Sequence, residues 1–153
     1  MKEQLLHTWQ LHQQMNLLLL EAISPAGLDA TLSTRGGRTV YQQWVHILSV
    51  RITWLEIVGK DKVKTISQVT KEDKQDKARL VKSLEQSAAA FASVFADACD
   101  AGGKLKGYKA GLLPFLGYLI SHESHHRGNI MLTLKQCGEK IPDKVKWGLW
   151  EWK

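Results

Sequence analysis

Residues 112–137 read LLPFLGYLISHESHHRGNIMLTLKQC, and this stretch decides how the chain is expected to fold. Projected at about 100° per residue, its apolar side chains gather on one side of a helix. They are Leu112, Phe115, Leu116, Leu119, Ile130, Leu134 and Cys137. A helix with one apolar face must cover that face with other elements. The stretch therefore predicts a long helix that packs against partner helices.

Three more segments have helical character, at about residues 2–23, 39–58 and 71–99. Clusters of Gly, Pro or Ser separate them, and no run alternates apolar and polar residues as a strand would. The fold class is therefore all-α, and four helices of this length predict a four-helix bundle. With 153 residues, the chain is expected to form a single domain, residues 1–153.

The charge pattern is that of a solvated surface. The net charge is +6, but the lysines between positions 60 and 82 are interleaved with acidic residues. Because no nucleic-acid-binding motif accompanies this charge, we expect no nucleic-acid partner. An anionic partner or a small acidic substrate stays open as an alternative.

The sequence also predicts where the protein is located. The N-terminal residues lack the apolar core of a signal peptide, and no run reaches the ~18 apolar residues of a membrane span. We therefore expect a cytoplasmic protein with no membrane partner. Cys99 and Cys137 are too few for a disulfide framework, and both are expected to be reduced thiols in the core.

Two histidines of the 112–137 helix point into its apolar side. His126 lies within the apolar stripe and His122 lies about one turn earlier at its edge, whereas His125 projects well outside it. Burying two imidazoles among leucines is unfavourable unless each nitrogen has a partner. A divalent metal accepts two neutral histidines at positions i and i+4. The alternative is that both are hydrogen-bonded core or surface histidines.

The second helix supplies a candidate for the third ligand. His46 is the only histidine of this helix, which is apolar nearly all round and carries Trp44 and Leu48 on the side opposite His46. We expect His46 to meet His122 and His126 inside the bundle, and the opposite side to face a second subunit. A hydrogen-bonded core histidine is again the alternative for His46.

Glu123 lies near the middle of the same apolar side, where an unpaired carboxylate is unstable. It has three candidate roles: acceptor for an N–H of a ligand histidine, ion-pair partner of Arg127, or general base toward a bound water or thiol. We expect Glu123 and Arg127 to support the ligand histidines rather than to catalyse, because this helix face is needed for packing.

Residues 122–126 read HESHH and so also satisfy H-E-x-x-H, the motif of zinc metalloproteases. Those enzymes need a third ligand, usually downstream, and a strand that holds the peptide. No histidine follows His126 and no strand candidate precedes the helix, so the sequence disfavours proteolysis.

The histidine pattern resembles that of the DinB-like (DinB/YfiT) family of four-helix bundles. The resemblance rests on His46 followed eight residues later by Trp54, on the run HESHHRG at 122–128, and on Trp9 and Asn16 in the first helix. It spans almost the whole chain. Relatives usually read HRGQ where this chain reads HRGN, which changes the contacts of that last side chain and not the ligands.

The resemblance implies a site for one divalent metal, often nickel or zinc, formed by His46, His122 and His126, and it implies a homodimer. Some relatives resemble thiol S-transferases or isomerases that use a low-molecular-weight thiol. We therefore expect a metal-dependent enzyme with an open three-histidine site, either a hydrolase or a thiol S-transferase, acting on a small molecule. The alternative is a non-catalytic dimeric helical bundle that binds a metal or a small molecule.

Two other features have several interpretations. The tail WGLWEWK at 147–153 could wall the metal site with its tryptophans, pack them over the open end of the bundle, or form a dimer contact. In the first helix, His12 is expected to be structural or exposed, and Asn16 to bond loop backbone or to contact substrate.

Overall fold

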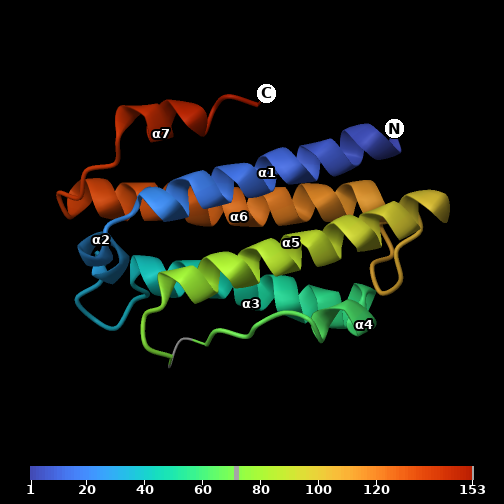
Figure 1. The fold of residues 1–153 in the computed structure, drawn as a ribbon, viewed down its shortest axis with the longest axis horizontal. Coiled ribbons are helices and arrows are strands. Elements are labelled where there is room, and N and C mark those ends of the chain that lie inside the picture. The colour runs from blue at the N-terminus through green and yellow to red at the C-terminus, as the bar shows by residue number, and fades with distance from the viewer. Residues whose placement is uncertain (71–72, 153) are drawn as a thin grey trace.

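Four long helices packed side by side form the body of the protein (Figure 1). The structure is a computed structural model that describes residues 1–70 and 73–152. The long helices are α1 (Lys2–Ala22), α3 (Val40–Val58), α5 (Lys77–Asp100) and α6 (Leu112–Gln136), and the short ones are α2 (Pro25–Asp29), α4 (Lys60–Val63) and α7 (Asp143–Gly148). In place of strands, the described residues contain only an isolated bridge between Leu105 and Tyr108. The predicted all-α class and the helical bundle are confirmed.

The long helices enclose one aromatic core. α1 and α3 each pack against both α5 and α6. Trp9, Trp44, Phe91, Phe95 and Phe115 are fully buried between them. The ring of Trp9 meets Phe91 and Phe95 edge-on, with centroids 5.5 Å apart in both pairs, which is a preferred aromatic geometry.

The expected subunit contact on α3 is wrong. Trp44 and Leu48 are fully buried within the chain itself, so they are not available to a second subunit. α3 is apolar nearly all round because α5 and α6 of the same chain cover different sides of it. Helical projection found both apolar sides correctly, but assigned one of them to the wrong partner.

Three of the four predicted helices agree with the structure to within one residue at each end. The fourth, predicted from residue 71, begins too early. Residues 71 and 72 lie outside the described residues, residues 73–76 are not helical, and α5 starts at Lys77. Asp76 caps this helix, because its side chain accepts a hydrogen bond of 2.9 Å from the backbone N–H of Arg79.

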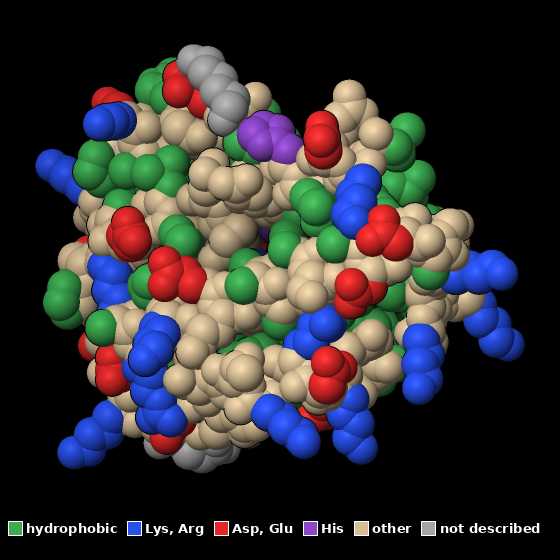
Figure 2. Space-filling view, turned by 45° about the vertical axis from the view of Figure 1, so that its right-hand side comes forward, with side chains coloured by type: hydrophobic (Ala, Val, Ile, Leu, Met, Phe, Trp, Pro, Cys, Tyr) green, Lys and Arg blue, Asp and Glu red, His purple; other side chains and the backbone are tan. Residues whose placement is uncertain are grey.

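Acidic and basic side chains are interspersed on the face of the molecule shown in Figure 2, in keeping with a solvated surface. Cys99 is half-buried and Cys137 is exposed, both with free thiols. The expectation of a core thiol is therefore wrong for Cys137. This residue is the C-cap of α6 and follows the last buried turn of the helix.

The tail after α6 packs along α1 through α7 (Figure 1). Trp147 and Trp150 are 70% and 80% exposed, so they do not pack over the end of the bundle. The interpretations left for the tail tryptophans are a wall of the metal site and a contact with another molecule.

None of the described helices combines the length and the apolar character needed to cross a bilayer.

Candidate metal centre

His46, His122 and His126 come together between α3 and α6, as the sequence predicts. Each offers one ring nitrogen, and these three atoms lie within 4.8 Å of one another. The ring centroids are 5.4 Å apart for His46 and His122, 4.8 Å for His46 and His126, and 4.7 Å for His122 and His126. His126 is buried, and His46 and His122 are half-buried. We call these three residues the histidine cluster.

Helix geometry explains how the cluster forms. His122 and His126 are one turn apart and share a face of α6, and the packing of α3 against α6 brings His46 opposite them. His125 lies off this face, is exposed, and makes a hydrogen bond of 3.0 Å with the side chain of Asn129. Its position agrees with the helical projection.

Two nitrogen atoms of the cluster have no protein partner. The Nδ1 atoms of His122 and His126 are buried, and neither makes a hydrogen bond within the residues that the structure describes. Buried polar atoms are rarely left in this state, and a metal ion would satisfy them. Nitrogen ligands of tetrahedral zinc lie about 3.3 Å apart, because each bond is about 2.0–2.1 Å long. Small side-chain rotations are therefore enough to fit the cluster to an ion.

The surroundings keep the three imidazoles neutral. Burial, followed by the neighbouring His122 and His46, lowers the pKa of His126 to about 4. Burial is also the main reason why the pKa values of His46 and His122 lie below their ordinary value. Metals bind the neutral imidazole, so at neutral pH no proton has to leave before an ion binds.

Glu123 lies between the two α6 ligands in sequence and is the centre of a buried polar network. Arg51 of α3 donates two hydrogen bonds to its carboxylate, from Nε to Oε1 and from Nη2 to Oε2, both 2.7 Å long. Asn16 Nδ2 donates to Oε2 at 2.7 Å, and His12 Nε2 lies 2.8 Å from the same oxygen. Burial alone would raise the pKa of Glu123, but the charge and hydrogen bonds of Arg51 hold this pKa far below its usual range. Glu123 is therefore ionised.

Arg127 extends this network toward α1. Its Nη1 donates to Asn16 Oδ1 at 2.6 Å and lies 3.3 Å from His12 Nδ1, while its Nη2 donates to Ser124 Oγ at 2.9 Å. Burial lowers the pKa of His12, so this ring is neutral. Its partners then fix the tautomer: Nε2 carries the proton toward Glu123, and Nδ1 accepts from Arg127.

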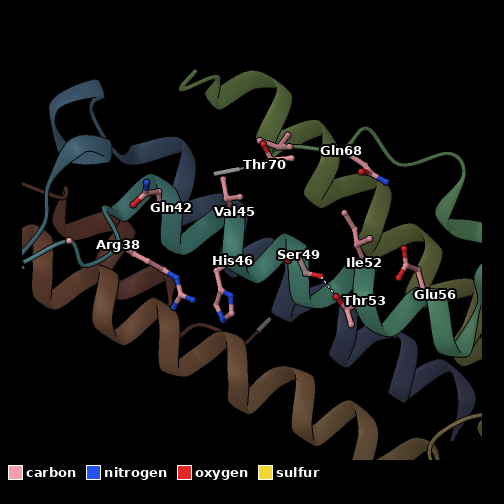
Figure 3. Close-up of a pocket in the computed structure, with 12 residues that line it drawn as sticks. Arg38, Gln42, Val45, His46, Ser49, Ile52, Thr53, Glu56, Gln68 and Thr70 are labelled. Atoms are coloured by element: carbon pink, nitrogen blue, oxygen red, sulfur yellow. Dashed lines mark hydrogen bonds between the residues drawn. The ribbon is translucent and has the colours of Figure 1, made fainter. Parts of the chain in front are cut away.

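A polar groove opens beside the cluster (Figure 3). It has a volume of about 690 Å³ and runs between one face of α3 and residues 68–70. Arg38 and His46 line one part of it, and Glu56 lies farther along α3. In Figure 3 the side chains of Arg38 and His46 extend in the same direction, toward α6. The groove therefore gives a small molecule access to His46.

Comparison with protein families gives one match, to the DinB family, over residues 1–147. The chain belongs to the DinB family. Comparisons with curated proteins and with solved structures gave no match. The DinB match covers α1, α3, α5 and α6, and so includes every residue of the histidine cluster and of the Glu123 network. The family resemblance seen in the sequence is confirmed.

In this DinB protein the contacts of Glu123 and Arg127 differ from those expected. Within the described residues, Glu123 makes no hydrogen bond to a histidine of the cluster, and its ion-pair partner is Arg51 rather than Arg127. Asn16 joins the same network instead of bonding loop backbone. Sequence reasoning missed Arg51. The signal for it was a lone arginine in the middle of a helix that is apolar nearly all round.

The metalloprotease alternative finds no support in the structure of this DinB protein. Both oxygens of Glu123 accept hydrogen bonds from Arg51, so the carboxylate is not free to take a proton from water. The part of the chain that the structure describes also has no strand to hold a peptide beside the helix. The match to the H-E-x-x-H motif in this chain therefore does not indicate a metalloprotease site.

Proposed function

We propose that this DinB-family protein is a divalent-metal-dependent enzyme that acts on a small molecule, as a hydrolase or as a low-molecular-weight-thiol S-transferase. The proposal rests on His46, His122 and His126, since the buried Nδ1 atoms of the last two have no protein partner within the described residues. Three neutral imidazoles suit nickel and zinc, and they leave coordination positions open, as in catalytic rather than structural sites.

The chain's own residues provide the binding and the positioning. A divalent ion, when bound, supplies Lewis acidity and lowers the pKa of a water or thiol at its open positions. His122 and His126 hold it from α6 and His46 holds it from α3. The Arg51–Glu123 pair fixes these two helices against each other, which keeps the ligands at a constant spacing. The polar groove admits the small molecule on the His46 side.

A non-catalytic metal-binding protein is the second candidate, and one observation favours it. Glu123 is the only acidic residue of α6, and Arg51, Asn16 and His12 all engage its carboxylate. This helix therefore offers no free carboxylate to move a proton at the ion.

The first prediction tests the metal centre itself. Elemental analysis of protein purified without an affinity tag is expected to find about one divalent ion per chain, because the site has one set of three ligands. His126→Ala removes the most buried ligand and should abolish most of this metal content. His125→Ala is the matched control, because this exposed neighbour lies off the cluster and should leave the stoichiometry unchanged. Undiminished metal in His126→Ala would contradict the proposed ligand set.

The same material distinguishes the two candidates. The metal-loaded protein and His126→Ala are assayed with small esters, and with thiols plus electrophiles. Turnover that requires both the metal and His126 supports the enzyme. A full complement of metal without turnover in either class of assay supports the non-catalytic protein.

A further inference from the structure

Arg38 stands beside the histidine cluster, and its side chain has no partner among the residues that the structure describes. Its guanidinium makes no hydrogen bond or ion pair within residues 1–70 and 73–152. Figure 3 shows its side chain next to His46, extending toward α6. After burial, the charge of Arg38 is the largest cause that lowers the pKa of His46, which agrees with this proximity. The cluster thus has a cation beside it that the fold does not use.

The loop before α3 holds Arg38 in place. Ser33 Oγ accepts a hydrogen bond of 2.8 Å from the backbone N–H of Gly37, and Thr31 Oγ1 donates one of 3.3 Å to the carbonyl of Arg38. Gly36 has a φ of 81°, a left-handed conformation that favours glycine. The residue after Arg38 is the N-cap of α3. Arg38 is therefore presented by an ordered turn at the start of the helix.

The groove has opposite charges at its two ends. Arg38 lies just before α3, and Glu56 lies about 24 Å along this helix from its first residue, Val40, at 1.5 Å per residue. The groove side chains of α3 between them are neutral, His46 included, and the others include Gln42, Ser49 and Thr53. An anionic group is therefore attracted to the Arg38 end, next to the cluster, and repelled from the Glu56 end.

We propose that Arg38 binds the carboxylate of a small substrate or thiol cosubstrate whose reactive end reaches the histidine cluster. The inference rests on the proposed metal function and names the chemical class of its ligand. The planar fork of a guanidinium matches a carboxylate with two parallel hydrogen bonds. One cation balances the single charge of a carboxylate but not the charge of a phosphate dianion, which favours the carboxylate.

Matched thiols test this proposal on the cobalt(II)-loaded protein. Mercaptocarboxylates of increasing chain length, from 3-mercaptopropionate to 6-mercaptohexanoate, are compared with the corresponding neutral mercaptoalcohols. The readout is the dissociation constant, measured from the thiolate-to-cobalt charge-transfer absorption, so no turnover is needed. At the best chain length, the parent should bind the carboxylate about 2- to 5-fold more tightly than the alcohol, because Arg38 is exposed and solvent weakens its pairing with a carboxylate.

Arg38→Ala should reduce this ratio to about one, and Arg38→Lys should keep part of it. The ratio of the two dissociation constants is compared because the Arg38 charge also acts on the ion and on the thiolate. That general effect is the same for the carboxylate and the alcohol, so it cancels in the ratio. Arg35→Ala is the control, since Arg35 is an exposed arginine of the same loop that does not line the groove.

The outcomes separate this inference from the function on which it rests. If cobalt and thiols bind but the ratio is near one at every chain length, or if Arg38→Ala keeps the preference, the carboxylate site is wrong and the metal centre stands. If no cobalt binds, the proposed function fails and the carboxylate site fails with it.

Discussion

Four hydrogen bonds from α1 and α3 converge on the carboxylate of Glu123, and its pairing with Arg51 has a measurable consequence. Both side chains are 1% exposed. Glu123→Gln leaves the Arg51 guanidinium buried without a counter-charge, and breaking a buried pair in this way costs about 3–5 kcal/mol. We therefore expect the free energy of unfolding, measured by urea denaturation of the metal-free protein, to fall by about this amount.

Two further variants show whether the loss comes from the pair. The first is Arg51→Met, which removes the other charge of the pair. The second combines Arg51→Met with Glu123→Gln, and it should lose less stability than the two single variants added together, because no unpaired charge then stays buried. Additive costs would show that the two charges are not coupled. Lys2 and Asp100 form a surface ion pair at 2.6 Å, and Lys2→Ala is the control, which should change stability far less than either buried variant.

The ionised state of Glu123 also predicts the acid sensitivity of the protein. Arg51 holds the pKa of Glu123 far below the ordinary value of 4.5, to which it returns on unfolding. Its contribution to stability is therefore present above about pH 4.5 and is lost as the pH falls below that value, because the unfolded state then binds a proton that the folded state does not. The stability difference between the parent and Glu123→Gln should narrow as the pH falls from about 5 to 3. A constant difference across this range would contradict the assignment.

Among the elements, α5 shows how a single cap fixes a boundary. Asp76 accepts a hydrogen bond from Arg79 at the first turn of this helix, and residues 73–76 before it are not helical. Asp76→Ala removes the cap and should lower the free energy of unfolding by about 1 kcal/mol. Asp76→Asn is the control and should cost less, because asparagine caps comparably well. Equal losses in both variants would point to the charge rather than to the cap.

The helices could be predicted because each is specified locally. Gly, Pro and Ser mark the ends of α1, α3 and α6, and Thr39 and Gln42 form a capping box that starts α3. The start of α5 was predicted too early because the charged residues at 71–76 show no periodic apolar pattern that would mark where a helix begins. Asp76, a favoured N-cap residue, was the available signal.

The pairing between helices is the part that the sequence does not specify locally. Helical projection showed that His46, His122 and His126 point inward. His46 could be chosen as the third ligand because it is the only histidine of its helix. It did not show that Arg51 lies opposite Glu123, because the rotation and offset of α3 against α6 depend on the packing of the whole core. For the same reason Trp44 and Leu48 were assigned to a subunit contact instead of to the bundle core.

At the scale of the whole molecule, the Glu123 network involves all four long helices. Its side chains come from α1, α3 and α6, and Arg51 also donates to the carbonyl of Leu84 and to Ser87 Oγ on α5, both at 3.1 Å. The network therefore reaches the fourth helix as well. A bundle joined in this way keeps the spacing of α3 and α6, which the three-histidine site requires.

The exposed apolar surface leads to the last prediction, a homodimer that uses the tail in place of α3. Three of the six tryptophans are exposed, and all three lie within residues 147–152. Tryptophan is enriched at protein interfaces, and α7, which carries Trp147, packs along α1. Light scattering at micromolar concentration is expected to give about twice the chain mass of 17.3 kDa. The double variant Trp147→Ser/Trp150→Ser should give a folded monomer that melts cooperatively, because both side chains are outside the core, with a melting temperature lowered only by the loss of the dimer contact. If the parent is a monomer, the predicted homodimer is wrong. If the double variant is still a dimer, the two subunits do not meet through the tail.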